Sequence, residues 1–223
     1  MASGEILVFT KYLQNKIANH LNTADLRVGV VSVTPTQSTD EFWSDISSYE
    51  VSTGSSYSAA NGGSGYQLSS TTGTITAASK AASCVLTITS NPFVTGDLIS
   101  ISSVVGMTEL NGLCFEVTAY TSTTATIDVD STGFTTYTSG GTAESRCKRD
   151  GVEIVFNSIV ASWAYDATGF TNGNSAPIFE YNASASAAQL VCFFQFASTM
   201  SLQSSGGAYI SWPGSGIARF NPS

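Results

Sequence analysis

The chain has 223 residues, which is enough for one large β domain or two smaller ones, each with its own core. Hydrophobic residues make up 42% of it and charged residues only 11%, so the composition excludes a chain that is disordered by its charge. The formal net charge of −8 would repel a phosphate backbone, and the bases cluster only at Arg146, Lys148 and Arg149, so we expect no nucleic-acid partner.

Ser and Thr together exceed a quarter of the residues, and with 20 Gly they favour short strands and many turns. We therefore expect a mainly β fold. No apolar run reaches the roughly 18 residues that a membrane span needs, and the first residues lack the pattern of a signal peptide, so we expect no membrane partner and no export. The four cysteines show no CxxC spacing and lie in or beside strand-like runs, which favours buried, reduced thiols.

The first predicted element is a helix over Glu5 to Leu21. Apolar side chains recur there at a helical spacing, at Phe9, Leu13, Ile17 and Leu21. Polar residues lie off that stripe, which is typical of one amphipathic helix.

A strand follows over Leu26 to Thr34. It is apolar on both faces, which indicates a sheet that is covered on both sides. The segment Thr39 to Tyr49 predicts a short helical turn at the edge of the core. Ser, Gly, Tyr and Asn dominate Glu50 to Ser70, which predicts a long loop or hairpin with little core.

Period-two alternation appears in several short runs between Gly73 and Ala143. The inner faces are predicted as Cys84, Leu86 and Ile88; Leu113, Phe115, Val117 and Ala119; and Ala125, Ile127 and Val129. We expect residues 73–143 to form a small β-barrel or sandwich of their own.

Strand-like alternation resumes after Val152. The run Leu190 to Phe196 is too apolar for a strand with one wet face, so it belongs in the centre of a covered sheet or under a partner subunit. The sequence thus predicts a β-sandwich-like base domain with one N-terminal helix (residues 1–72 plus 144–223), interrupted by an inserted β-barrel (residues 73–143).

The middle of the chain resembles the small β module named after the first catalytic cysteine half-domain of ubiquitin-activating enzymes, which recurs in virion proteins of tailed phages. The strings that carry the resemblance are Thr87 to Ser90, Gly96 to Ile101, Val105 to Gly112, Phe115 to Val117 and Ser131 to Gly141. The resemblance implies a structural module, and neither Cys84 nor Cys114 inherits ubiquitin chemistry from it.

The flanking segments resemble small phage structural proteins whose genes lie beside capsid genes. The N-terminal helix carries this second resemblance together with Asp25 to Val31, Glu50 to Ser52, Val152 to Phe156, the Trp163 strand and Ile210 to Ile217. In those proteins a tight turn and a strand replace the inserted module.

No catalytic or cofactor-binding constellation emerges from the sequence. The single histidine, His20, has no nucleophile elbow nearby, and the acids occur mostly singly. Asp128 and Asp130 offer oxygen ligands but lack the glycine and distal glutamate of an EF-hand loop. We expect no catalytic residues, no metal and no cofactor.

The resemblances imply a non-enzymatic phage virion protein, made in the host cytoplasm and placed on the capsid surface, where it decorates and stabilises the lattice of the major capsid protein. A homo-oligomer is expected, with a trimer favoured. The candidate interface residues are Phe194, Phe196, Trp212, Arg146, Lys148 and Arg149.

Two alternatives stay open. One is a receptor- or carbohydrate-binding module of a tail fibre or baseplate, with Tyr57, Tyr66, Phe134 and Tyr137 available to stack on sugars. The other is a virion-associated hydrolase. The basic cluster would dock on acids of a neighbouring subunit, or would be a solvated linker.

Overall fold

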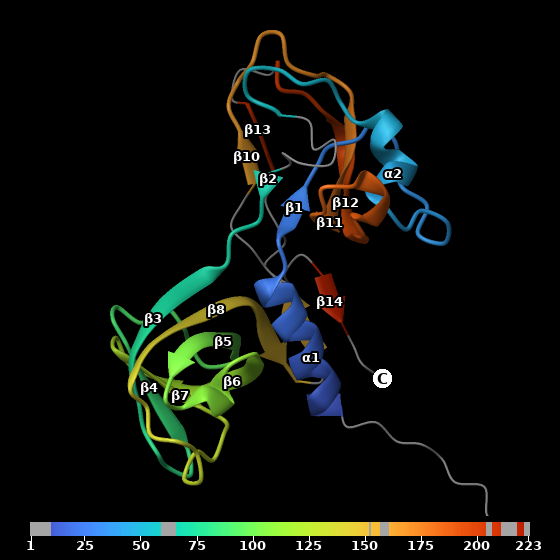
Figure 1. Cartoon of the computed structure of the whole chain (residues 1–223). Coiled ribbons are helices and arrows are strands. Elements are labelled where there is room, and N and C mark those ends of the chain that lie inside the picture. The colour runs from blue at the N-terminus through green and yellow to red at the C-terminus, as the bar shows by residue number, and fades with distance from the viewer. Residues whose placement is uncertain are drawn as a thin grey trace, which may run out of the picture. The chain divides into compact units, whose positions relative to one another are not determined.

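The computed structural model describes residues 10–58, 66–151, 153–156, 161–203, 207–210 and 218–220. The chain forms two compact units. Unit 1 contains Met1–Thr23, Ser70–Asn157 and Ser215–Ser223, and unit 2 contains Ala24–Ser69 and Ser158–Gly214. The fold is mainly β with few helices, which confirms the fold class expected from the sequence (Figure 1).

A closed six-stranded barrel forms the centre of unit 1 (Figure 1). The order around it is β8-β3-β4-β7-β6-β5, and β5 pairs again with β8 to close the ring. The strands are β3 (Thr71–Ala78), β4 (Cys84–Ile88), β5 (Asp97–Val105), β6 (Leu113–Tyr120), β7 (Thr124–Ile127) and β8 (Ser139–Asp150). A short 3₁₀ turn, η2 (Thr108–Leu110), follows β5.

The barrel core comes from the alternating residues that the sequence indicated. Cys84, Leu86 and Ile88 of β4 are fully buried, and so are Ala125 and Ile127 of β7. This confirms these predicted inward positions, because alternate side chains of a strand point to one face. Val129, the third residue predicted for the inner face of β7, lies beyond the end of that strand and is half-buried against the core.

Strand β6 departs from the predicted alternation at both ends. Phe115 and Val117 are buried, but Leu113 is 43% exposed and Ala119 is exposed. A register shift between Val117 and Ala119 in the pairing with β7 explains the second difference, since an extra residue turns the following side chains to the other face.

Two further strands extend the barrel wall. The end of β8 pairs with β9 (Glu153–Phe156), and β9 pairs with β14 (Ala218–Phe220). Helix α1 (Thr10–Thr23) packs against β5, β6, β8 and β9 (Figure 1).

The helix was expected in the base domain, but the structure places it in the unit of the barrel. Its buried residues are Gln14, Ala18, Leu21 and Asn22, whereas Leu13 and Ile17 of the predicted stripe are half-buried. Phe9 lies outside the described residues. The predicted boundaries at 72 and 144 therefore differ from the observed ones, because β8 continues past Ala143 to carry the helix-binding face.

Unit 2 contains two separate sheets among its described residues. Their orders are β12-β11-β1-β2 and β10-β13. The strands are β1 (Leu26–Val28), β2 (Tyr66–Gln67), β10 (Ala161–Trp163), β11 (Gly173–Glu180), β12 (Leu190–Met200) and β13 (Ala208–Ile210). Three short helices are α2 (Trp43–Ile46), η1 (Ser47–Tyr49) and η3 (Ala185–Ala187).

Strand β1 lies between β11 and β2, and Leu26, Val28, Val30 and Val31 are all fully buried. The segment after η1 was expected to hold little core, and the structure corrects this. Tyr57 is buried, its hydroxyl accepts a hydrogen bond from the backbone N–H of Val30 at 2.9 Å, and it donates to Glu50 at 2.9 Å. A segment rich in Ser and Gly can thus supply a core residue, because two hydrogen bonds satisfy the hydroxyl of the buried Tyr57.

No helix in the described part of the chain has the length and hydropathy of a membrane span.

Candidate functional site

Strand β12 is the edge strand of the four-stranded sheet, and within the described ranges it pairs with β11 alone. The run Leu190 to Phe196 therefore does not lie in the centre of a sheet, which was one of its two predicted places. Leu190, Val191, Cys192, Phe193 and Phe196 are only half-buried.

The composition of β12 is unusual for an edge. Its 11 residues, LVCFFQFASTM, carry no charged side chain and no proline. Edge strands are commonly protected from association by charges, prolines or bulges. The pairing of β12 with β11 is regular from Cys192 to Gln195, between two register shifts, so this uncharged stretch is the part of the edge that is suited to pair with another chain. The other predicted place of this run, under a partner subunit, stays a prediction.

The start of β12 already binds another segment of unit 2 on its outer side. Phe42 forms an antiparallel bridge with Gln189. The backbone N–H of Leu190 donates to the carbonyl oxygen of Glu41 at 2.8 Å, and the N–H of Trp43 donates to that of Ala188 at 2.8 Å. The Trp43 ring is buried and stacks on Phe179 with 4.6 Å between ring centroids, which fixes this segment to the sheet.

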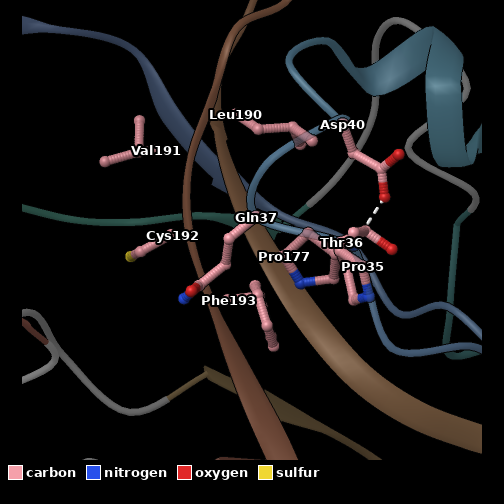
Figure 2. A pocket seen from close by; sticks show the side chains of 9 residues that line it. All are labelled: Pro35, Thr36, Gln37, Asp40, Pro177, Leu190, Val191, Cys192 and Phe193. Carbon is pink, nitrogen blue, oxygen red and sulfur yellow. Dashed lines mark hydrogen bonds between the residues drawn. The ribbon is translucent and has the colours of Figure 1, made fainter.

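A pocket of about 310 Å³ lies between β12 and the loop that precedes α2. Figure 2 shows the residues that line it, which are Pro35, Thr36, Gln37, Asp40, Pro177, Leu190, Val191, Cys192 and Phe193. The backbone N–H of Thr36 donates to the Asp40 carboxylate at 2.7 Å, so this carboxylate holds the loop in place (Figure 2).

Cys192 is one of the residues that line this pocket, and burial raises the pKa of its thiol to about 12. The thiol is therefore neutral at physiological pH. A second hollow of about 350 Å³ adjoins the pocket and shares Gln37, Asp40 and Leu190 with it. Glu41 lines this second hollow, so the acidic side chains of Asp40 and Glu41 lie at a pocket whose lining is polar and apolar in equal measure.

The aromatic interface candidates lie partly in this region. Phe194 and Phe196 are both on β12, half-buried, with 5.8 Å between their ring centroids. Trp212 lies outside the described residues.

The basic candidates lie in unit 1, on β8, and the structure does not place Arg146 or Arg149 in a linker. Arg146 Nη1 donates to the carbonyl oxygens of Leu21 at 2.8 Å and Asn22 at 2.7 Å, so it satisfies carbonyls at the end of α1. Its positive charge also suits the negative end of the helix dipole.

Arg149 forms an ion pair with Glu116 at 2.8 Å and donates hydrogen bonds to Gln14 and Asn15 of α1. These two arginines hold the helix on the barrel. Lys148 is exposed on the same strand, and nothing in the structure tests it as a contact for a partner.

The remaining polar candidates also have partners within unit 1. Asp128 pairs with Lys11 and accepts a hydrogen bond from the backbone N–H of Glu116 at 2.7 Å. Asp130 accepts from the N–H and hydroxyl of Thr132 at 2.9 and 2.6 Å. Across the described ranges, no three His, Cys, Asp or Glu side chains gather closely enough to hold a metal ion.

The aromatic side chains considered for sugar stacking are not exposed platforms. Tyr57 is buried, and Tyr66 is half-buried against Trp163 with 5.7 Å between ring centroids. Phe134 and Tyr137 pack against the barrel core.

Sequence reasoning missed the pocket beside β12. Its loop meets the strand through the bridge between Phe42 and Gln189 and the hydrogen bonds beside it, and these two segments lie far apart in the chain. The absence of charge from Leu190 to Met200 was a readable signal of an association edge.

A family model for the FCCH domain of ubiquitin-activating enzyme E1 matches residues 82–146. The match lies within the barrel of unit 1 and confirms the resemblance stated for the middle of the chain. No curated protein matches the chain. The chain thus carries a module similar to the E1 FCCH domain, built into a larger two-unit β protein.

Proposed function

We propose that the protein is a non-enzymatic structural component of a tailed-phage virion, and that it decorates the capsid surface by binding the lattice of the major capsid protein. The observation that carries the proposal is the uncharged edge strand β12 with its half-buried apolar side chains and adjoining pocket. The likeness of the flanking segments to small phage structural proteins supports the choice of partner.

The physical basis of this function is buried surface. A stable contact covers about 1,600 Å² in total, with an apolar centre and a polar rim. β12 offers apolar side chains for the centre, and the Ser- and Thr-rich surface elsewhere remains hydrated without charge. A subunit that bridges neighbouring capsomers reinforces the shell because each contact must break before the capsomers separate.

Electron cryomicroscopy of virions that carry the tagged chain tests the proposal. We expect density for it on the head and binding of the purified chain to heads that lack it. Phe196→Asp should weaken that binding at least tenfold, because it places a charge within the contact. Asp130→Asn, a change at an exposed position, should not alter it. Density on tail fibres or the baseplate would instead support the receptor-binding alternative.

Self-association belongs to the same proposal, with a trimer as the expected state. Sedimentation equilibrium of the purified chain and of the chain released from heads measures it. A monomer in both samples would contradict the trimer and would leave capsid binding to be judged by the head-binding experiment.

A further inference from the structure

Strand β12 turns backbone hydrogen-bonding groups away from its sheet at two defined residues. Phe193 lies opposite Pro177 of β11. Pro177 has no N–H, and its carbonyl oxygen accepts from the N–H of Gly29 at 3.1 Å on the side of β1. In an antiparallel pair of strands, two residues directly opposite each other point their backbone N–H and carbonyl groups either toward each other or both away from each other. Because Pro177 points its carbonyl toward β1, Phe193 must point its own groups away from β11. The N–H and carbonyl of Phe193 therefore point toward the edge on which no described strand pairs with β12.

Gln195, two residues further along β12, has the same orientation as Phe193. Gln195 lies opposite Ser175, whose N–H and carbonyl bond to Val31 at 3.1 and 3.0 Å. The backbone groups of Gln195 therefore also face outward. Phe193 and Gln195 are spaced as alternate residues of one edge, which is the spacing at which an added antiparallel strand bonds.

This edge accepts a chain segment in the structure itself. The Phe42 segment bridges Gln189 on the side of β12 that faces away from β11 and ends where the pocket begins. The edge of β12 from Phe193 onward lies on the same side as that bridge. The pocket lies beside this edge, and Pro35, Pro177 and Leu190 give it apolar surface.

The charge around the pocket selects the chemistry of an added strand. Among the residues that the structure describes, Asp40 and Glu41 are the charged ones that line the pocket and its adjoining hollow, and none of the lining residues is Lys or Arg. Asp40 is engaged with Thr36, whereas Glu41 is exposed. A basic side chain fits this rim. A second copy of this chain fits less well, because each copy has a net charge of −8.

We propose that β12 binds its partner by strand addition: an extended segment of another protein pairs with Phe193 and Gln195, places an apolar side chain in the pocket and sets a basic side chain near Glu41. This inference rests on the proposed function, in which the segment belongs to the capsid protein, and it names how that protein is recognised.

A matched pair of substitutions at Gln195 tests the backbone contact. Gln195→Pro removes the outward N–H, and proline is tolerated in an edge strand where the N–H faces solvent. Gln195→Ala removes the side chain and its hydrogen bonds to Asn174 but keeps the N–H. We expect Gln195→Pro to weaken binding about tenfold, as the loss of one hydrogen bond implies, and Gln195→Ala to bind within about twofold of the unmodified chain.

A charge variant tests the rim. Glu41→Gln should weaken binding about threefold and reduce its dependence on salt, since an exposed ion pair contributes little and is screened. Circular dichroism melts establish that each variant is folded. If Gln195→Pro does not fold, hydrogen exchange of the Phe193 and Gln195 amides in the unmodified chain replaces it. Both amides should slow when the partner binds, and unchanged exchange would overturn the proposal.

Two probes separate this inference from the proposed function. The first is phage heads that lack the chain, and the second is a library of 12-residue peptides selected for binding to the whole purified chain. Heads that bind Gln195→Pro as well as the unmodified chain would overturn strand addition and leave the capsid role standing. Peptides with an apolar and a basic residue that lose binding to Gln195→Pro would support strand addition even if heads do not bind. Self-association that Gln195→Pro abolishes would make a second copy the occupant and overturn the assigned partner.

Discussion

The side chain of Asn22 joins the end of α1 to the barrel and is fully buried. Its amide nitrogen donates to the carbonyl oxygen of Leu98 at 2.7 Å and to the hydroxyl of Ser100 at 3.1 Å, and its amide oxygen accepts from the N–H of Arg146 at 2.7 Å. Asn22→Ala leaves a buried donor and a buried acceptor without partners. We expect a loss of about 2–4 kcal/mol in the free energy of unfolding of unit 1, measured by urea denaturation.

Thr23→Ala is the control for this change because it alters the neighbouring residue of the same helix. Thr23 is exposed and its hydroxyl donates to the carbonyl oxygen of Asn19 at 2.9 Å. The control should change the free energy of unfolding by no more than about 0.5 kcal/mol. Equal losses in the two variants would show that the buried network does not hold α1.

The carboxylate of Asp166 makes the free energy of unfolding of unit 2 decrease at low pH. Its carboxylate accepts from the N–H and hydroxyl of Thr168 at 3.0 and 2.9 Å, and from the N–H of Ser55 at 2.7 Å. These hydrogen bonds, those from Thr168 first, lower its pKa to about 2. The pKa in the unfolded chain is about 3.9, so the carboxylate stabilises the fold above about pH 4 and loses this effect as the pH falls toward 2.

Thermal melts of the whole chain between pH 5 and pH 2 measure this effect on the transition of unit 2. The melting temperature of the unmodified protein should fall across that range, and Asp166→Asn should flatten the fall because an amide does not titrate there. Asp130→Asn controls for the loss of a carboxylate whose hydrogen bonds lie in the other unit. A fall of the same size in Asp166→Asn would contradict the assignment to Asp166.

At the scale of elements, the sequence predicted helix α1 but not which of its residues are buried. Periodicity predicted a helix correctly, since it depends on residues close in the chain. It did not predict that Gln14 and Asn22 would be buried, because their partners Arg146 and Arg149 are more than 120 residues away. A polar residue enters a core only where distant donors and acceptors meet it.

For strand β12, too, one property could be predicted from the sequence and another could not. Its apolar composition identified it as a surface that must be covered, while its place at the sheet edge follows from the strand order, which local patterning does not contain. The site could therefore be predicted as a segment, but its pocket and open edge could not.

Two residues in the sequence motifs shared with the FCCH module, Gly106 and Asn111, are needed for the turn that follows β5. Gly106 has φ +89°, and a Cβ there would lie 2.2 Å from the carbonyl oxygen of Thr136. The turn after β5 thus packs against the segment that leads into β8. The side chain of Asn111 holds the same turn through two hydrogen bonds to the backbone of Val104, each 2.9 Å.

Three alanine substitutions in this module separate backbone strain from crowding. Gly106→Ala adds both, Gly112→Ala adds only strain at φ +74°, and Gly133→Ala adds neither, since nothing lies within 4 Å of its Cβ position. We expect losses in the free energy of unfolding of more than about 2, about 1 and about 0 kcal/mol, respectively. Chemical denaturation measures the series, and the opposite order would contradict the packing described for this turn.

At the scale of the whole molecule, each unit has a core of its own. The barrel of unit 1 is filled by residues such as Leu86, Ile99 and Val117, and unit 2 buries Trp43 against Phe179 and Val31. The chain enters and leaves each unit more than once, so neither is a continuous segment. A buried core with satisfied polar groups is the usual basis of a cooperative transition, and a chain with two cores can show two.

Calorimetry of the intact chain tests this division through the two residues already discussed. Asn22→Ala should lower the melting temperature of one transition, and Asp166→Asn, compared at pH 7, should lower only the other, because the carboxylate that accepts from Thr168 and Ser55 lies entirely within unit 2. The double variant should show both shifts, with each as large as in the single variant, since the two networks share no residue. Both substitutions moving one common transition would mean that the chain unfolds as a single cooperative unit.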